Sequence, residues 1–454
     1  MMGSLCSVFS SNRVQAVLAG AVTAAALSLG ASSPALAIMP VNLGSDMQCP
    51  HDIDNAPFGW AGGGRMDAGD IDWNGDGTYN NKDGAPANPN QVCLRVGATD
   101  GYYKMPDGTN HYMFGFTDLT GIPENKLVDH KFEAKLPAPT VDVTEGQELF
   151  LTITNLALLV RPDLPDPHTI HFHGFPHAMS AFDGVPHSSV TAPAGASFTY
   201  YYKLNDPGTY AYHCHVEPTE HIAMGMVGTL VVHPRINVPG DPGFNPASPL
   251  HAYDDQLAGS PNTAYNKEYV IHVHDVDPTM PHNLETVQEM NTRWAQFSPT
   301  YFTINGRAYP DTLLGNNNTT MRNGASVYKA DYIAQNVSSL ITIPQGQRVL
   351  LRLNNLTYQD HSLTIPGIPM RVVGEDAQIL RSRYGKDLSF TRTAYSLAGG
   401  QQAEVILDTT GLAKGTYFLY ARELYAQASL TREERDLGTG EFNRNGMITE
   451  IRIQ

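Results

Sequence analysis

The sequence is poor in charged residues, and this shortage argues against several classes of protein. Only 16% of its 454 residues are charged, while it contains 41 glycines and 31 prolines. A helical bundle or a coiled coil has a charged composition rich in alanine and leucine, so neither fits. Lysine and arginine number 29 against 45 aspartates and glutamates, which gives a formal charge of −16. Because phosphate binding needs a basic face, this balance argues against nucleic acid as a partner.

Long apolar runs are also scarce, and the longest lies at the N-terminus. Arg13 precedes an apolar run that ends near Gly30, and residues 34–37 (PALA) form a small-residue cleavage signature. The run is short for a membrane span, and polar residues follow it at once. We therefore expect residues 1–37 to be a cleaved signal peptide of a secreted or periplasmic protein, and the rest of the chain to have no membrane span.

Strand signals dominate the remainder of the chain. The 22 tyrosines and 16 phenylalanines favour pleated surfaces, and glycine and proline punctuate short strands. Alternating segments such as Glu148–Thr154, Ser197–Lys203 and Glu268–His274 predict strands. Residues 38–93 are rich in Gly, Asn and Asp, which predicts an irregular N-terminal extension. Residues 237–266 belong largely to a proline-rich stretch and are predicted to form an interdomain linker.

The second half of the chain repeats the first. Residues 146–156 (GQELFLTITNL) align with residues 346–356 (GQRVLLRLNNL), and residues 208–210 (GTY) align with residues 415–417 (GTY). Two copies of one β-sandwich explain such a repeat. The predicted fold is all-β, with two Greek-key β-sandwiches in tandem at residues 94–236 and 267–454.

The first copy contains the ligands of a blue-copper site. A thiolate, two imidazoles and a weakly bound thioether make such an electron-transfer site. The predicted ligands are Cys214, His168, His221 and Met226. Met224, two residues before Met226, is the alternative thioether.

Four more histidines surround these ligands. Successive side chains of a strand point to opposite faces. His171 and His173 therefore share one face, as do His213 and His215, while Cys214 points the other way. Four imidazoles can thus converge on one side while the thiolate binds copper on the other.

The motifs HxxHxH and HCH, followed by a His and a Met, resemble the multicopper oxidase family of cupredoxin-fold proteins. The resemblance covers residues 94–454 and implies an exported copper oxidoreductase with two cupredoxin-like domains. It implies type 1 copper at the blue-copper ligands, a type 2 ligand at His171 and type 3 ligands at His173, His213 and His215. Family members oxidise phenols, metal ions or other donors and reduce dioxygen to water.

The second copy departs from the family pattern. A family trinuclear oxygen site takes eight histidines, four from each of two domains. Here Thr364 and Pro366 stand opposite the first histidine pair, and residues 420–422 (YAR) stand opposite the HCH motif. Only His361 and Met447 match predicted ligands of the first copy. This chain alone therefore does not provide the complete site.

Two alternatives to an oxidase therefore stay open. One is a blue-copper electron carrier or copper-binding protein that has lost oxygen reduction, and the other is a structural or interaction module. The sequence does not identify the redox partner. A homo-oligomer or a second subunit also remains open.

The N-terminal extension contains a motif for a second metal. Residues 72–83 (DWNGDGTYNNKD) have the spacing of an EF-type calcium loop and resemble the loop of dockerin modules. The predicted calcium ligands are Asp72, Asn74, Asp76, Thr78, Asn80 and Asp83. A solvated acidic turn is the alternative interpretation.

Few cysteines remain after cleavage of the predicted signal peptide. Cys6 leaves with that segment, and in an oxidising compartment Cys49 and Cys93 can form a disulfide. Cys214 is then the unpaired thiol, which agrees with its predicted role as a metal ligand.

Overall fold

The computed structural model describes residues 90–428 and 446–454, apart from residues 106, 123, 177, 247–248, 287–293, 317–318, 323–324 and 329–331. The predicted signal peptide (1–37), the calcium loop (72–83) and Cys49 lie outside the described residues. Cys93 is buried and disulfide-bonded, and its pairing with Cys49 stays a prediction. All described residues belong to one unit, Val41–Gln454, by their mutual contacts.

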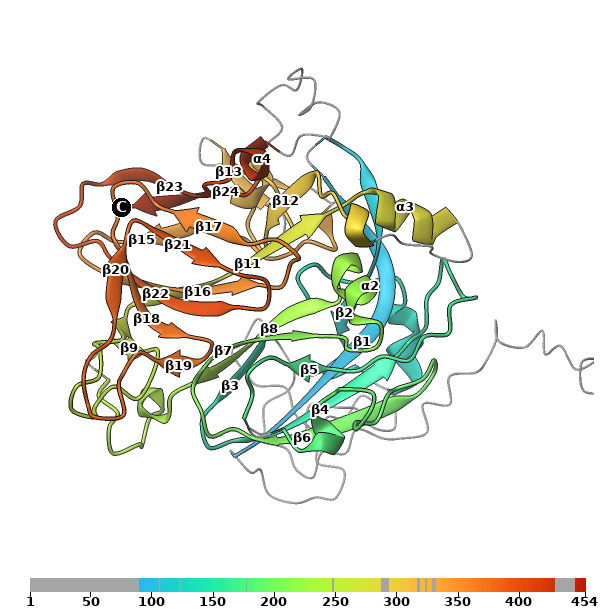
Figure 1. Ribbon diagram of the computed structural model, residues 1–454, viewed down its shortest axis with the longest axis horizontal. Coiled ribbons are helices and arrows are strands. Elements are labelled where there is room, and N and C mark those ends of the chain that lie inside the picture. The colour runs from blue at the N-terminus through green and yellow to red at the C-terminus, as the bar shows by residue number, and fades with distance from the viewer. Residues whose placement is uncertain are drawn as a thin grey trace, which may run out of the picture. The chain divides into compact units, whose positions relative to one another are not determined.

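Residues 91–233 form two four-stranded sheets that share one apolar core (Figure 1). The strand orders are β2-β1-β4-β6 and β3-β8-β7-β5. The strands are β1 (Gln91–Lys104), β2 (Asn110–Asp118), β3 (Val141–Thr144), β4 (Glu148–Asn155), β5 (His171–Phe172), β6 (Ser197–Lys203), β7 (Gly208–His213) and β8 (Val227–His233). Leu151 of β4 and Tyr212 of β7 meet in the core, because alternate residues of each strand point inward. This first sandwich begins at Gln91, slightly before the predicted boundary.

Residues 267–453 form a second pair of sheets around a second core. One sheet has the order β12-β11-β16-β22-β18-β19, with β20 paired to β18, and the other has the order β15-β24-β23-β17-β21. The strands are β11 (Lys267–Val276), β12 (Tyr301–Ile304), β15 (Ile341–Ile343), β16 (Arg348–Asn355), β17 (His361–Thr364), β18 (Met370–Glu375), β19 (Gln378–Ile379), β20 (Phe390–Arg392), β21 (Ala394–Leu397), β22 (Gln402–Asp408), β23 (Gly415–Ala421) and β24 (Ile448–Ile453). Two short pairs stand apart from these sheets: β9 (Leu250–His251) with β10 (Ala264–Tyr265), and β13 (Thr319–Arg322) with β14 (Ala325–Tyr328).

The strand pairing repeats as the sequence does. β1 pairs in parallel with β4 as β11 does with β16, and β3 pairs in parallel with β8 as β15 does with β24. The two aligned GQ motifs lead into β4 and β16. The prediction of an all-β fold with two repeated sandwiches is therefore confirmed.

Helices are few and short in the part of the chain that the structure describes. They are α2 (Pro218–Met224), α3 (Thr279–Thr286) and α4 (Leu424–Ala428), with short 3-10 segments at Glu124–His130, Ser180–Phe182, Arg235–Asn237, Trp294–Gln296 and Asp311–Leu313. Among the described residues, no helix has the length and apolarity needed to cross a membrane. α2 has proline at its first position and ends at Gly225, whose φ of 111° is in the left-handed region that glycine tolerates.

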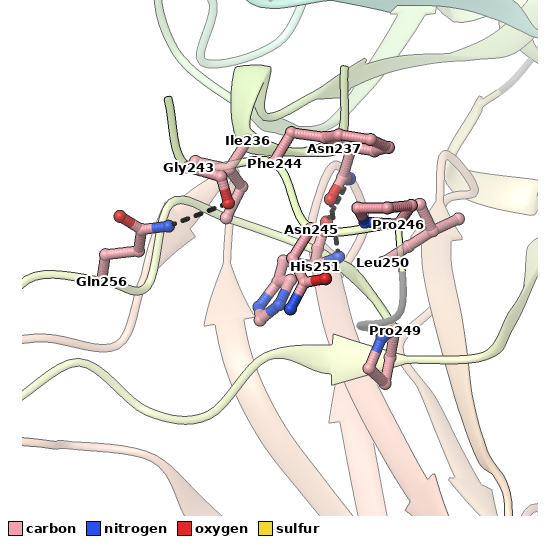
Figure 2. Close-up of a pocket in the computed structure, with 10 residues that line it drawn as sticks. All are labelled: Ile236, Asn237, Gly243, Phe244, Asn245, Pro246, Pro249, Leu250, His251 and Gln256. Carbon is pink, nitrogen blue, oxygen red and sulfur yellow. Dashed lines mark hydrogen bonds between the residues drawn. The ribbon is translucent and has the colours of Figure 1, made fainter. Parts of the chain in front are cut away.

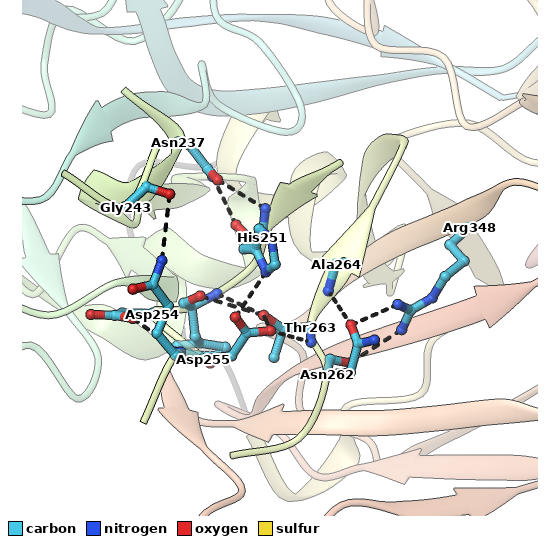
Figure 3. Close-up of polar contacts among 11 residues, drawn as sticks. Asn237, Gly243, His251, Asp254, Asp255, Asn262, Thr263, Ala264 and Arg348 are labelled. Carbon is cyan, nitrogen blue, oxygen red and sulfur yellow. Dashed lines mark hydrogen bonds and ion pairs between the residues drawn. The ribbon is translucent and has the colours of Figure 1, made fainter. Parts of the chain in front are cut away.

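The segment predicted as a linker, residues 237–266, is folded onto the second sandwich. The side chain of Asn237 exchanges hydrogen bonds of 2.8 and 2.9 Å with the backbone of His251, and Arg348 donates to Asn262 at 2.8 Å (Figure 3). The buried hydroxyl of Tyr253 donates to Glu404 at 2.7 Å. These contacts attach a proline-rich stretch to the neighbouring sheet.

A buried polar layer joins the two sandwiches. Glu404 of β22 accepts the backbone N–H of Thr209 at 2.8 Å, and Arg352 of β16 donates to the hydroxyl of Thr209 at 3.1 Å. Asn354 donates to the hydroxyl of Thr229 on β8 at 2.8 Å. All of these side chains are buried, so their hydrogen bonds fix the second sandwich against the outer face of β7. β7 is the strand that leads into Cys214.

Candidate metal centre

Cys214 follows β7 and lies in the core of the first sandwich as a buried free thiol. Its Sγ lies 3.2 Å from Nδ1 of His221 and 3.6 Å from Nδ1 of His168. The backbone N–H of Thr169 donates to the same sulfur at 3.5 Å. One ligand atom from each of these three side chains lies within 4.8 Å of the others, so the structure brings together three of the four predicted blue-copper ligands.

His168 is held in place by a neighbouring segment. It exchanges two backbone hydrogen bonds of 2.9 Å with Ala192. The amide of Asn155, at the end of β4, donates to the carbonyls of Asp166 and Ala192 at 2.9 and 3.0 Å. One buried side chain therefore fixes both segments that position His168.

His221 and Met226 come from α2 and the turn that follows it. After Gly225 ends the helix, Met226 donates its backbone N–H to the carbonyl of His221 at 2.9 Å and accepts that of Cys214 at 3.3 Å. The backbone of Met226 is thus bonded to two of the other predicted ligands. Met224 is buried in the same core, so the choice between the two thioethers stays a prediction.

Burial sets the protonation of this cysteine site. It lowers the pKa of His221 to about 4 and the pKa of His168 well below its ordinary value, and it raises the pKa of the Cys214 thiol to about 11. Both imidazoles are therefore neutral at pH 7 and offer lone pairs. A metal ion that displaces the thiol proton gains a soft thiolate and two imidazoles, the donor set that suits copper.

Three histidines converge on the opposite face of β7. His171 of β5 pairs with His213 of β7, and the backbone N–H of His173 continues this ladder to Ala211 at 2.8 Å. One ring nitrogen from each of His171, His173 and His213 lies within 4.8 Å of the others, and we call these residues the three-imidazole group. The ring of His215 lies beside them, 4.9 Å from that of His171, without belonging to this group of nitrogens.

The ring nitrogens of the three-imidazole group have defined orientations. Each Nδ1 faces a backbone carbonyl, which only accepts. At the two short contacts, those of His171 and His213, Nδ1 therefore carries the proton and Nε2 carries a lone pair. The contacts are His171 with Asp183 at 2.6 Å, His213 with Cys214 at 2.7 Å and His173 with Gly400 at 3.4 Å.

The Nε2 atoms of two of these rings face each other. Nε2 of His173 and Nε2 of His213 are 2.9 Å apart. At this distance one ring donates a proton to the other, or a metal ion lies between the two nitrogens. Nδ1 bound to a carbonyl with Nε2 left available is also the usual arrangement of metal-binding histidines, so the group fits a metal.

A hollow of about 340 Å³ borders the three-imidazole group. It is lined by His171, His173, Gly174, Asp376, Gly400 and Gln402. The last three residues come from the second sandwich, and they could not be found from the sequence because no local motif marks them. Tyr420, the first of the three residues that stand opposite the HCH motif in the sequence, lies on β23 in the other sheet of the second sandwich and does not line this hollow.

The counterpart of His168 in the second sandwich forms an ion pair. Nε2 of His361 lies 2.7 Å from Asp275, and its Nδ1 lies 3.9 Å from Glu423. Burial alone would lower the pKa of His361, but hydrogen bonds and charges from the two carboxylates raise it to about 9. His361 is therefore protonated at neutral pH and offers no lone pair to a metal.

Two acidic residues lie beside the cysteine site. One carboxylate oxygen each of Glu217 and Glu220 lies within 4.8 Å of a ring nitrogen of His221. Burial, followed by the charges of Glu217 and Asp166, raises the pKa of Glu220 to about 7. Nε2 of His221 is buried and has no hydrogen-bond partner among the described residues.

A second hollow, of about 470 Å³, lies in the folded connecting segment (Figure 2). Its walls include Phe244, Pro246, Leu250 and the ring of His251. Nδ1 of His251 lies 2.9 Å from Asp255, which orients the ring. None of the ligand groups found among the described residues borders this hollow.

Comparisons with known proteins agree with the donor chemistry. A family model described as multicopper oxidase matches residues 128–237. A copper-containing nitrite reductase of Neisseria meningitidis is 33% identical over 152 residues, which cover 33% of this chain and 33% of that protein. Copper resistance protein A of Escherichia coli is 24% identical over 323 residues, which cover 66% of this chain and 46% of that protein. The chain thus spans a third to a half of the length of these curated relatives.

Solved structures show the same fold. The blue copper oxidase from Nitrosomonas europaea aligns with a TM-score of 0.54 and 20% identity, over 80% of this chain and 86% of that one. The multicopper oxidase mgLAC also aligns with a TM-score of 0.54, at 19% identity over 80% of this chain. The two sandwiches are therefore cupredoxin-like, as predicted. The family match includes His168, Cys214 and His221, so residues 128–237, which contain three of the predicted copper ligands, are similar to a multicopper oxidase domain.

Proposed function

We propose that the chain is an exported copper oxidoreductase that transfers electrons through a type 1 copper site in its first domain. The ligands in this proposal are Cys214, His168, His221 and Met226. The observation that carries it is the buried Cys214 sulfur with two imidazole Nδ1 atoms at 3.2 and 3.6 Å. Copper supplies reversible exchange of single electrons at this donor set. In this proposal residues 94–236 are the copper-binding domain, residues 267–454 the second domain and residues 237–266 their connection.

The surrounding residues would keep this site rigid and dry. The N–H of Thr169 stabilises negative charge on the sulfur, and the side chains that surround Cys214 in the apolar core exclude water. His213 and His215 flank Cys214 in the chain, so the peptide bonds between them connect the cysteine site to the three-imidazole group. An electron can follow this covalent path from one site to the other.

The colour of the copper-loaded protein tests the proposal. A copper(II)–thiolate bond gives an intense visible band, and among the described residues Cys214 is the free cysteine. Cys214→Ser should abolish the band and leave the far-ultraviolet circular dichroism unchanged. Met226→Leu should shift the band, whereas the matched change Met224→Leu should not. A blue colour that survives Cys214→Ser would refute the assignment.

An electron carrier without oxygen chemistry is the second candidate function. Two observations favour this candidate. His361 is ion-paired, and Thr364 and Pro366 stand in the second sandwich where the first has its predicted ligands His171 and His173. Metal analysis of the purified chain separates the candidates. Copper in the type 1 site alone supports a carrier, a full set of coppers supports an oxidase, and a copper-free protein supports a structural module.

We also infer that the protein is exported after removal of residues 1–37. The oxidised state of Cys93 supports this inference, because disulfides persist in oxidising compartments. N-terminal sequencing of the protein recovered from its native cells should begin near Ile38. An N-terminus at Met1 would contradict export by this route.

Calcium binding by residues 72–83 is a further part of the proposal. The spacing of Asp72, Asp76 and Asp83 supports it. Calcium should raise the melting temperature of the native protein, and Asp72→Ala combined with Asp83→Ala should remove that rise. Equal melting curves with calcium and with chelator would count against the site.

A further inference from the structure

The connecting segment forms a hollow that is separate from the groups of metal-binding side chains. This hollow of about 470 Å³ is lined by residues that all lie between Ile236 and Gln256 (Figure 2). Clefts that bind small molecules have volumes of about 300 to 1,000 Å³, mostly apolar walls and a few fixed polar groups. The size of the hollow fits such a cleft, so its walls and its polar groups decide which ligand suits it.

Much of the wall is apolar, and among the described residues none that lines the hollow carries an acidic or a basic chain. The apolar side chains are Ile236, Phe244, Pro246, Pro249 and Leu250. A Cβ atom at Gly243 would lie 3.0 Å from Cγ2 of Ile236, so the absence of a side chain at Gly243 lets the two walls approach. Because burial of an unpaired charge in apolar surroundings is costly, this wall favours a neutral ligand with a hydrophobic ring.

His251 is a polar group that neighbouring residues hold in place at this hollow. The side chain of Asn237 exchanges hydrogen bonds of 2.8 and 2.9 Å with its backbone. Nδ1 of His251 is buried and lies 2.9 Å from the carboxylate of Asp255, whereas 24% of the side chain as a whole is exposed (Figure 3). The exposed part of the ring is therefore the edge away from Asp255, and this edge carries Nε2.

The carboxylate of Asp255 sets the tautomer of His251. The backbone N–H and the hydroxyl of Thr263 donate to it at 2.7 and 3.0 Å. Burial alone would raise the pKa of Asp255, but its contacts with His251 and Thr263 lower that pKa, so the carboxylate is ionised. An ionised carboxylate beside Nδ1 keeps a proton on that nitrogen, and the neutral ring then presents a lone pair at Nε2. The hollow thus offers an acceptor for an O–H group, and the nearby negative charge disfavours anions.

We propose that the hollow in the connecting segment binds a small neutral ligand that has a hydrophobic ring and a hydroxyl group. The ring packs against Phe244 and the two prolines, and the hydroxyl donates to Nε2 of His251. Asn237 and Asp255 act as positioning residues, because they hold the backbone and the ring of His251. None of the predicted copper ligands lines this hollow, so the proposal is independent of the proposed copper function.

Benzyl alcohol and benzyl methyl ether test the hydrogen bond to His251. The two compounds share a ring and an oxygen, but only the alcohol has an O–H to donate. The purified full chain should bind the alcohol about tenfold more tightly than the ether, because the ether leaves Nε2 without a donor. Titrations followed by the nuclear magnetic resonance signals of the two compounds measure both affinities. Equal affinities, or no binding of the alcohol, would overturn the proposal.

The variant His251→Phe separates recognition of the ligand from a purely structural role of His251. It keeps an aromatic ring and loses the acceptor, so the preference for the alcohol should disappear while the ether binds as before. Equal weakening of both compounds would instead show a structural role and overturn the proposal. The matched variant His233→Phe removes a histidine whose Nε2 lies 3.0 Å from Asp142, outside the hollow, and should leave both affinities unchanged.

A second variant tests the apolar wall without altering the ion pair of His251 and Asp255. Phe244→Ala removes the aromatic side chain that faces the ligand ring in this proposal. It should weaken the alcohol and the ether to the same extent, so the preference between them should persist. Unchanged affinities in Phe244→Ala would overturn the proposal, because the compounds would then bind elsewhere.

Discussion

One asparagine occurs at the same place in both sandwiches. Asn155 ends β4 and Asn355 ends β16, and each donates its amide to two backbone carbonyls. In the first sandwich one of these carbonyls belongs to Ala192, the bridge partner of His168. The same arrangement therefore supports the predicted copper ligand His168 in one half of the chain and, through Leu397, the ion-paired His361 in the other.

This pair gives a matched test of how His168 is positioned. Asn155→Ala and Asn355→Ala each leave two carbonyls without their donors, so each should lower the free energy of unfolding by about 1 to 3 kcal/mol. Only Asn155→Ala should also shift or broaden the blue band, because only it loosens the segment that carries His168. Urea denaturation and visible spectra of both variants provide the comparison. Identical blue bands in the two variants would show that His168 is held by other contacts.

At the scale of elements, β11 and β17 are joined across the two sheets of the second sandwich. Asp275 of β11 and His361 of β17 form a buried ion pair of 2.7 Å, with Glu423 nearby. Ion pairs in a core contribute only while both partners are charged, so this connection depends on the protonation of His361.

The stability of the second sandwich should therefore fall in mild alkali. The pKa of His361 is raised from an ordinary value near 6.5 to about 9, so its contribution is fully present below pH 6.5 and is lost as the pH rises through 9. The loss should be at most about 3 kcal/mol. Chemical denaturation between pH 6 and pH 10 measures it, and His361→Gln should flatten that part of the profile. A native protein with constant stability over this range would contradict a protonated His361.

Many elements could be predicted from local patterns, and the exceptions have a physical reason. β6 coincides with the predicted strand Ser197–Lys203, because alternation is a clear signal over seven residues. β9 and β10 contain two residues each and show no period, so their stretch was expected to be a linker. What folds that stretch is burial of Tyr253 and Tyr265 against distant strands.

At the scale of the whole molecule, the clustering of the cysteine and histidine motifs was predictable and their surroundings were not. The cysteine and histidine ligands follow from spacing within short segments. Gly400, Asp376 and Gln402 stand about two hundred positions away from His173 in the chain, and their proximity depends on how the two sandwiches pack. That packing rests on single long-range contacts such as the one between Thr209 and Glu404, which no local pattern encodes.

The isolated chain should reduce oxygen weakly or not at all. Complete reduction to water takes four electrons and several coppers, whereas the second sandwich offers Asp376, Gly400 and Gln402 to the imidazoles and keeps His361 in an ion pair. We expect the copper-loaded protein to exchange single electrons with small redox dyes while an oxygen electrode records little uptake on phenolic donors. The variant Cys214→Ser, which lacks the proposed thiolate ligand, serves as the negative control for both measurements. Brisk uptake by the pure, copper-loaded protein would contradict this expectation, because it would show that the deficit of the second sandwich is made good.

The alternation along β7 also limits how this chain can change in length. Tyr210, Tyr212 and Cys214 point into the core of the first sandwich, while Thr209 and His213 point to the opposite face, where Thr209 contacts Arg352 and His213 contacts His173. Inserting a single residue within β7 would turn either the tyrosines or the thiol to the wrong face. Insertions or deletions in this strand can therefore be tolerated only in steps of two, whereas the loop after His215 is free of that restriction.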